Sequence, residues 1–226
     1  MNLYIVSTPI GNLEDITYRA VRTLNEVDFV CAEDTRTSKR LMDKYEISTP
    51  LTSFHAHSSD GKRAAIVRRI IDGESAALIS DAGTPGISDP GWTLIRDCLD
   101  ADINVVPIPG ASAVLSGLVG SGLPMDKFLY LGFLPLKKGR QTLFTSLADV
   151  KKTIIFYESP KRILRTLRQM SEYLPERTRV VIGRELTKLH EEFIRGTFRE
   201  VIDILEAKPS IKGEIVAMVK HDGSAK

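Results

Sequence analysis

Short apolar runs alternate with amphipathic segments along the first half of the chain. Residues 3–6, 27–32, 76–79 and 105–108 are runs typical of buried strands. The segments between them have apolar side chains at helical spacing, and helices are expected at 13–24, 37–45, 62–71, 92–99 and from 111 to 118. Residues 51–54 are expected to be extended. This rhythm predicts an α/β domain with a mainly parallel sheet.

A second set of elements follows the glycine- and proline-containing stretch 120–124, which breaks the first pattern. Strands are expected at 128–132, 153–157, 179–182 and 214–220, an extended stretch at 192–196, and helices at 141–147, 161–173 and 201–207. Several connections are too short for a crossover helix, so some of these strands are expected to pair antiparallel. The sequence therefore predicts two α/β domains, residues 1–120 and 121–226.

The composition is that of a globular protein, because 42% of the 226 residues are hydrophobic and the net charge is only +2. There is no run of about 18 apolar residues, so no membrane span is predicted. The first six residues lack the basic segment of a signal peptide, and a cytoplasmic location is expected. Cys31 and Cys98 form no Cys-x-x-Cys motif, so neither a disulfide framework nor a thiol metal site is indicated.

Charge is distributed unevenly along the chain. Residues 137–200 carry 15 Lys and Arg against 8 Asp and Glu, whereas the remainder carries 16 against 21. A local basic surplus is a weak indication of a polyanionic partner such as nucleic acid, and on charge alone a solvated surface is the favoured explanation.

Two loops that follow strands have the composition of ligand-binding segments. In an open α/β sheet, ligands bind beyond the carboxyl ends of the strands. The first loop, 7–12, matches neither the dinucleotide fingerprint nor a Walker A motif, and by itself it is best explained as a proline turn that caps the first helix. The second loop, 80–91, holds three Gly, two Pro and two Asp. Because ordering so long a loop is costly, a functional role is favoured over a structural loop with Asx-turns.

Two further strand ends carry candidate chemistry. Residues 109–113 begin a helix of small residues, whose free N–H groups suit a ligand, although a tight helix–sheet contact is equally consistent. Glu33 and Asp34 stand beside Arg36, which indicates either acid–base chemistry or a helix cap. His55 and His57 share one face without a third ligand, so no metal site is predicted.

Taken together, these motifs resemble the tetrapyrrole methylase superfamily, methyltransferases that use S-adenosylmethionine. The sequence is most similar to the ribosomal RNA small subunit methyltransferase I family, the cytidine 2′-O-methyltransferases of 16S ribosomal RNA. Members of this family often continue into a further small C-terminal domain, whereas this sequence stops soon after the last expected strand. The matching stretches are TPIGNLEDIT (8–17), EDTR (33–36), SDAGTPGISDPG (80–91), IPGASA (108–113), GFLP (132–135), YESPKR (157–162), RELTKLHEE (184–192) and KGEIV (212–216).

The resemblance implies two α/β domains with the cofactor in a cleft between them, and a homodimer. By position in the motifs, it implies that the following residues bind S-adenosylmethionine: Pro9, Ile10, Asp81, Ala82, Gly83, Thr84, Ile87, Ser112, Ala113, Tyr157, Gly183 and Glu214.

Methylation of a ribose hydroxyl benefits from a general base, because the hydroxyl is a very weak acid. Asp34, Glu185 and Lys188 are candidates, and Lys188 qualifies only if its surroundings lower its pKa. Candidate partners for the phosphates of the small-subunit RNA are Arg36, Lys137, Lys138, Arg140 and Arg162. Two alternatives stay open, a tetrapyrrole methyltransferase of the same superfamily and an inactive RNA-binding module.

Overall fold

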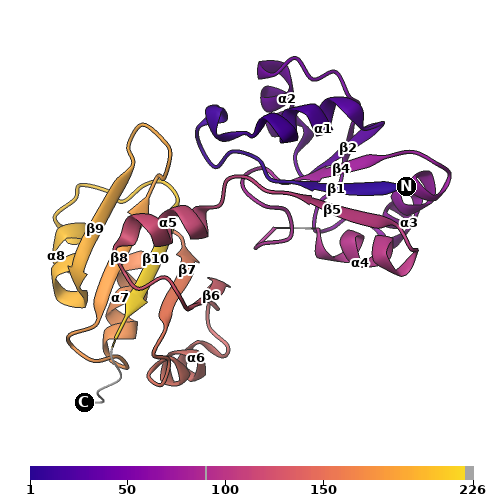
Figure 1. The fold of residues 1–226 in the computed structure, drawn as a ribbon. Coiled ribbons are helices and arrows are strands. Elements are labelled where there is room, and N and C mark those ends of the chain that lie inside the picture. Colours follow the sequence, from indigo (N-terminus) through magenta and orange to yellow (C-terminus); the bar gives the residue numbers. More distant parts are fainter. Residues whose placement is uncertain (90, 222–226) are drawn as a thin grey trace. The chain divides into compact units, whose positions relative to one another are not determined.

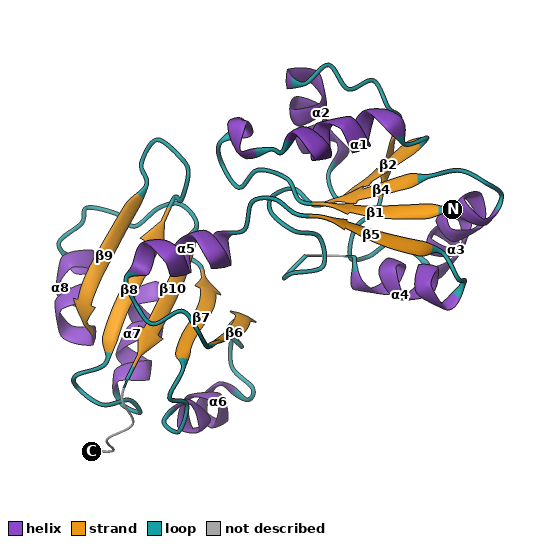
Figure 2. Ribbon diagram, in the orientation of Figure 1, coloured by secondary structure: helices purple, strands orange, loops and turns teal. Residues whose placement is uncertain are grey.

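The computed structural model describes residues 1–89 and 91–221. By the density of its internal contacts the chain divides into two compact units, Met1–Ser112 and Ala113–Lys226. Each unit contains a five-stranded sheet with helices packed against it, as Figures 1 and 2 show. The expected α/β class is therefore confirmed.

The sheet of the first unit is entirely parallel, with the strand order β3-β2-β4-β1-β5. Its inner strands β2 and β4 are buried along their whole length, because helices cover both faces of a parallel sheet. The strands are β1 (Asn2–Val6), β2 (Phe29–Ala32), β3 (Leu51–Ser53), β4 (Ala76–Ile79) and β5 (Asn104–Ile108).

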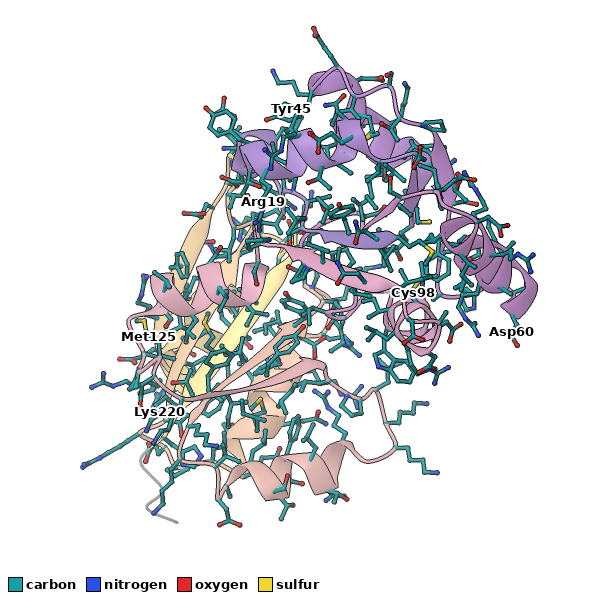
Figure 3. All side chains as sticks on the ribbon, turned by 45° about the vertical axis from the view of Figure 1, so that its right-hand side comes forward. Arg19, Tyr45, Asp60, Cys98, Met125 and Lys220 are labelled. Carbon is teal, nitrogen blue, oxygen red and sulfur yellow. The ribbon has the colours of Figure 1, made fainter. Side chains whose placement is uncertain are left out.

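Two pairs of helices cover the two faces of this sheet. Helices α1 (Tyr18–Glu26) and α2 (Thr35–Lys44) pack on one face through a core that includes Leu24 and Met42. Helices α3 (Asp60–Ile71) and α4 (Trp92–Asp100) pack on the other, with Ile70 and Cys98 in the core. In Figure 3 Arg19 of α1 and Cys98 of α4 accordingly lie on opposite sides of the sheet.

The predicted helix at 13–24 is wrong in its first part. The chain forms a 3₁₀ turn, η1 (Leu13–Asp15), and then extends at Ile16 and Thr17 before α1 begins. The Thr17 side chain accepts a hydrogen bond from the amide of Ala20, which is the ordinary action of an N-cap threonine. Helix α3 likewise begins at Asp60, two residues before the expected start at 62, and the side chain of Ser59 caps it.

The second unit has a mixed sheet with the order β6-β7-β10-β8-β9. Its first pair is parallel and the other pairs are antiparallel, as the short connections predicted. The strands are β6 (Phe128–Phe133), β7 (Thr153–Glu158), β8 (Arg179–Arg184), β9 (Glu192–Thr197) and β10 (Ile215–Lys220).

Helix α5 (Ala113–Ser121) lies on one face of this second sheet, and α6 (Arg140–Leu147), α7 (Ile163–Ser171) and α8 (Phe198–Glu206) supply apolar side chains to the core on the other face. Gly117 permits the close approach of α5, because a Cβ there would lie 2.7 Å from Cγ1 of Val216 on β10. The division by contacts therefore falls at 112/113, before α5, whereas the sequence places the boundary at 120/121. Among the described residues, no helix has both the length and the apolar character that crossing a membrane requires.

Candidate functional site

The first two loops meet at the carboxyl ends of β1 and β4. The amide of Thr8 donates to the carbonyl of Gly83 at 2.9 Å, and the amide of Gly83 donates back to Thr8 at 3.0 Å. The hydroxyl oxygens of Ser7 and Thr84 lie 2.9 Å apart. Gly83 has φ +81°, a conformation that favours glycine. Residues separated by about 75 positions in the chain thus form one rigid edge.

The third loop lies against the same edge. A Cβ on Gly110 would lie 2.9 Å from Cβ of Ser7, so only glycine fits there. The position that a Cβ of Gly83 would take is 3.5 Å from Ile10 and 4.0 Å from the carbonyl oxygen of Ala111. Three of the four predicted loops are therefore in contact within the first unit. Ser112 is the last residue of that unit, and Ala113 begins the second.

The fourth loop joins this group through Asp81. Oδ1 of Asp81 accepts a hydrogen bond from the amide of Asp34 at 3.1 Å, and the Asp81 backbone also lies near the Glu33 carboxylate. Asp89 lies close enough to be influenced by the charges of both Glu33 and Asp81. Burial and these two neighbouring charges raise the pKa of Asp89 to about 6, and burial with the Asp81 charge raises the pKa of Glu33.

Asp34 has the role of a helix cap. Its side chain accepts from the amide of Arg36 at 2.8 Å, at the N-terminus of α2. The Arg36 guanidinium pairs with the same carboxylate at 3.1 Å, and these hydrogen bonds lower the pKa of Asp34. Asp34, predicted as a general base, and Arg36, predicted as a phosphate ligand, thus bind each other. A carboxylate with a lowered pKa is poorly suited to accept a proton near neutral pH.

A pocket of about 210 Å³ opens beside these loops, beneath α2. Pro9 and Asp81, both predicted cofactor ligands, line it together with Ser38 and Arg40 of α2. The other lining residues are Thr8, Gly11, Leu13, Thr37, Leu41, Ile79 and Ser80. Asp81, placed by the sequence in a cofactor loop, thus also faces a cavity of the first unit.

In the second unit, two of the four predicted cofactor residues lie on one face of the sheet. Tyr157 of β7 and Gly183 of β8 are both register partners of Val216 on β10, so all three side-chain positions point the same way. The Tyr157 ring packs against the rings of Tyr130 and Phe133, with centroids 5.5 and 5.4 Å away. This arrangement forms an aromatic surface at the β6–β7 side of the sheet.

Glu214, another predicted cofactor residue of the second unit, belongs to an ion-pair cluster with the two remaining base candidates. Nζ of Lys188 is 3.0 Å from a carboxylate oxygen of Glu185 and 3.0 Å from one of Glu214. The amide of Glu214 also donates to Glu185 at 2.9 Å. The hydrogen bonds that Glu185 accepts lower its pKa. Burial lowers the pKa of Lys188, but the hydrogen bonds that Lys188 donates to Glu214 and Glu185 outweigh burial and raise it. The condition set for Lys188 as a base, a lowered pKa, is therefore not met.

The predicted RNA contacts of the second unit divide into two kinds. Lys137 and Lys138 are exposed in the loop before α6. Arg140 is buried, and its guanidinium donates to Pro135, Thr166 and Gln169, so the prediction that it binds phosphate is wrong. Its guanidinium is held in the interior because it donates from α6 to side chains of α7.

Arg162 is tied to the same interior network. It pairs with the fully buried Glu158 carboxylate at 2.5 Å and leaves about a quarter of its own side chain exposed, at 27%. Thr166 also donates to Glu158, at 2.7 Å. The primary role of Arg162 is thus to neutralise a buried carboxylate, which is costly to leave unpaired.

Sequence reasoning missed the α2 side chains that line the pocket. Ser38 and Arg40 lie in an amphipathic helix, where serine and arginine are unremarkable. The one available signal was the basic character of residues 35–44, four Lys and Arg against one Asp. Among the described residues, no group of three or more His, Cys, Asp or Glu side chains is arranged to hold a metal ion.

Known proteins are similar to this chain over most of its length. Residues 2–202 match the family model of the Tetrapyrrole (Corrin/Porphyrin) Methylases. A Synechocystis protein named ribosomal RNA small subunit methyltransferase I is 48% identical over 88% of this chain and 72% of its own length. The Thermotoga maritima protein of the same name is 46% identical over 96% of this chain and 97% of its own.

The fold is also similar to that of a solved enzyme. Uroporphyrin-III C-methyl transferase from Thermus thermophilus, in complex with S-adenyl homocysteine, superposes with a TM-score of 0.68 at 15% identity, over 98% of each chain. At so low an identity this likeness concerns the fold. The sequence matches, by contrast, are close and span nearly all the elements described above, so the chain belongs to the tetrapyrrole methylase family and, within it, to the ribosomal RNA small subunit methyltransferase I family.

Proposed function

We propose that this protein transfers the methyl group of S-adenosylmethionine to a cytidine 2′-hydroxyl in the RNA of the small ribosomal subunit. The observation that carries the proposal is the 46–49% identity, over most of the chain, to proteins named for that RNA. The convergence of loops 7–12, 80–91 and 109–112 in the first unit supports it, because such an edge at strand termini suits a ligand.

The chain's own residues fit the charge of the cofactor. S-adenosylmethionine, when bound, supplies a methyl group on a positively charged sulfur. Glu33, Asp81 and Asp89 supply negative charge beside the first two loops, and a cation taken out of water needs such partners. The positive φ of Gly83 lets its backbone approach a ligand without a side chain in between.

Other contacts of the cofactor are assigned by position in the family motifs. In the first unit we place Pro9, Ile10, Ala82, Thr84, Ile87 and Ser112 against it, and from the second unit Ala113, Tyr157, Gly183 and Glu214. The half-buried ring of Tyr157, set among Tyr130 and Phe133, offers the flat apolar surface that a purine requires.

For the proton of the ribose hydroxyl we propose Asp89. A general base works best with a pKa near the operating pH, and the pKa of Asp89 is about 6. The three acceptors suggested by the sequence are bound otherwise, since Asp34 caps α2, and Glu185 and Lys188 pair with each other. Asp89 is half-buried in the 80–91 loop, beside Asp81.

The RNA would contact basic side chains that keep their charge free for phosphate. Lys137 and Lys138 retain this role in our proposal, and Arg140 does not. A homodimer is also part of the proposal, and sedimentation at low protein concentration tests it.

The experiment that tests the function offers the protein three acceptors with isotopically labelled S-adenosylmethionine. These are in vitro transcribed small-subunit RNA, small subunits assembled on that RNA, and tetrapyrrole precursors. Label on either RNA acceptor is the expected result. Label on the tetrapyrroles alone would establish the alternative enzyme, and binding of RNA without any transfer would indicate an inactive RNA-binding module.

A further inference from the structure

The pocket beneath α2 contains a buried hydroxyl group without a partner. Ser38 is 4% exposed and lines the pocket, and its Oγ has no hydrogen-bond partner among the described residues. A buried polar atom left unsatisfied is unfavourable, and such groups in folded proteins are usually explained by a ligand or water. The lining residues given above define the α2 pocket, and their size and charge restrict what can fill it.

The size of the α2 pocket restricts the occupant. Its volume of about 210 Å³ is smaller than the roughly 300–1,000 Å³ of cavities that hold whole drug-sized ligands. It has room for a ring system or a sugar, and a complete S-adenosylmethionine molecule is too large. The occupant is thus one part of a larger ligand, the rest of which lies outside.

The pocket lining holds one residue of each charge, Asp81 from the second loop and Arg40 from α2. Arg40 lines the pocket, is exposed, and forms no ion pair with any residue that the structure describes. A guanidinium disfavours the cationic sulfur of the cofactor and suits a phosphate. Thr37 and Ser38 add two hydroxyl groups, which can both donate and accept hydrogen bonds.

The location of the pocket fits a group that must meet the methyl donor. Pro9 and Asp81 line the pocket and also belong to the two loops assigned to the cofactor. Methyl transfer requires the accepting oxygen to contact the methyl group, so the target nucleotide has to lie directly beside those loops. RNA readers and RNA-modifying enzymes commonly hold single unstacked nucleotides in this manner.

We propose that the α2 pocket receives one nucleotide of the RNA substrate, with the Ser38 hydroxyl binding its polar edge and Arg40 contacting a phosphate. This inference rests on the proposed function. The α2 pocket is then a substrate subsite of the first unit, in which Ser38 and Arg40 hold the target nucleotide.

The test compares Ser38→Ala and Arg40→Gln with matched controls. The probe is in vitro transcribed small-subunit RNA, used free and in assembled small subunits. Ser146→Ala removes a helical serine hydroxyl from α6, and Arg68→Gln removes one positive charge from α3 on the opposite face of the first sheet. Each variant is measured for KM toward RNA, for the Kd of S-adenosylmethionine by calorimetry, and for its unfolding midpoint.

We expect Ser38→Ala to raise the KM for RNA roughly three- to tenfold, the usual loss for one hydrogen bond. The Kd of the cofactor stays at the wild-type value, and the unfolding midpoint does not fall, because the lost hydroxyl had no partner. Arg40→Gln weakens RNA binding and reduces the slope of log Kd against log salt by about 0.7, the value for one phosphate contact on single-stranded RNA. Both controls behave as wild type.

Two results would overturn the subsite while leaving the function intact. In the first, the wild type methylates RNA, the KM for RNA of Ser38→Ala equals the wild-type value, and the salt slope of Arg40→Gln equals the wild-type slope. The other is a weakened Kd for S-adenosylmethionine in Ser38→Ala with KM for RNA unchanged, which would assign the pocket to the cofactor. Failure of wild type to methylate RNA at all is a different outcome, and it refutes the proposed function itself.

Discussion

Oδ1 of Asp81 accepts a hydrogen bond from the backbone amide of Asp34, 47 positions earlier in the chain, at a distance of 3.1 Å. The bond joins the ends of β4 and β2, which are neighbours in the first sheet. Asp81 therefore has two separable properties, an oxygen that fixes a neighbouring loop and a negative charge that faces the proposed site.

Substitution of Asp81 separates these two properties. Asp81→Asn keeps an oxygen acceptor for the Asp34 amide and removes the charge, so we expect the Kd of S-adenosylmethionine to rise roughly tenfold with little loss of stability. Asp81→Ala also removes the acceptor and is expected to cost about 1 kcal/mol more in the free energy of unfolding. Calorimetry and denaturant unfolding measure the two effects. Wild-type affinity in a folded Asp81→Asn protein would remove Asp81 from the cofactor site.

Gly83 tests the junction of the first two loops. Its φ of +81° is strained for any residue with a side chain, so Gly83→Ala is expected to destabilise the protein by about 1 kcal/mol. Because Gly83 exchanges two hydrogen bonds with Thr8, the substitution should also weaken cofactor binding several-fold. Gly73→Ala is the matched control, with φ +115° and open space around its Cβ. Equal cofactor affinity in the two variants would contradict the role given to this junction.

The pKa of Asp89, raised from 3.8 to about 6, predicts a pH-dependent cost in stability. The folded state favours the protonated carboxyl, so the cost is absent below pH 3.8 and grows as the pH rises through about 6. Asp89→Asn should therefore raise the free energy of unfolding by about 1–2 kcal/mol at pH 8 and leave it almost unchanged at pH 4. Chemical denaturation at the two pH values makes the comparison.

The same variant tests the catalytic role of Asp89. If its carboxylate accepts the hydroxyl proton, wild-type kcat declines below pH 6, and Asp89→Asn lowers kcat about 10²- to 10⁴-fold and abolishes this limb of the profile. Single-turnover methyl transfer across pH 5–9 supplies the profile. A variant with wild-type kcat and an unchanged acid limb would exclude Asp89 as the base.

Two kinds of basic residue in the second unit should respond differently to substitution. Arg140→Ala removes a buried side chain together with its hydrogen bonds to Pro135, Thr166 and Gln169, so it should destabilise the protein by about 2–3 kcal/mol. The double substitution Lys137→Gln and Lys138→Gln should leave stability unchanged and reduce the salt slope of RNA binding by about 1.4. Unfolding curves measure the loss of stability, and RNA titrations at several salt concentrations measure the salt slope. The opposite pattern would mean that Arg140 is available to RNA.

Much of the fold follows from the sequence because periodicity reports which side of a segment is buried. The alternation of strands and helices predicted the mainly parallel first sheet, and the short connections predicted antiparallel pairs in the second. The boundary between the two units was harder to predict, because Gly120 and Gly122 are typical of a linker. Gly117 and Gly120 in fact bring α5 close to Val216 and Phe193 of the second sheet.

The candidate site was predictable at the level of loops and much less at the level of side chains. Glycine and proline mark where a chain must turn or be approached closely, so the 7–12, 80–91 and 109–113 loops stand out. Whether a charge is free depends on partners distant in sequence, as with Arg140 and Gln169, 29 positions apart. Ser38 gave no signal, because a missing hydrogen-bond partner becomes visible only in three dimensions.

The most direct test of the account is to locate the transferred methyl group by mass spectrometry. Small-subunit RNA, free and in assembled subunits, is incubated with the protein and isotopically labelled S-adenosylmethionine, digested with nucleases and analysed as nucleosides. The account predicts a labelled methyl group on the ribose of a cytidine. A methyl group on a base, or RNA without label from a protein that binds the cofactor, would contradict it.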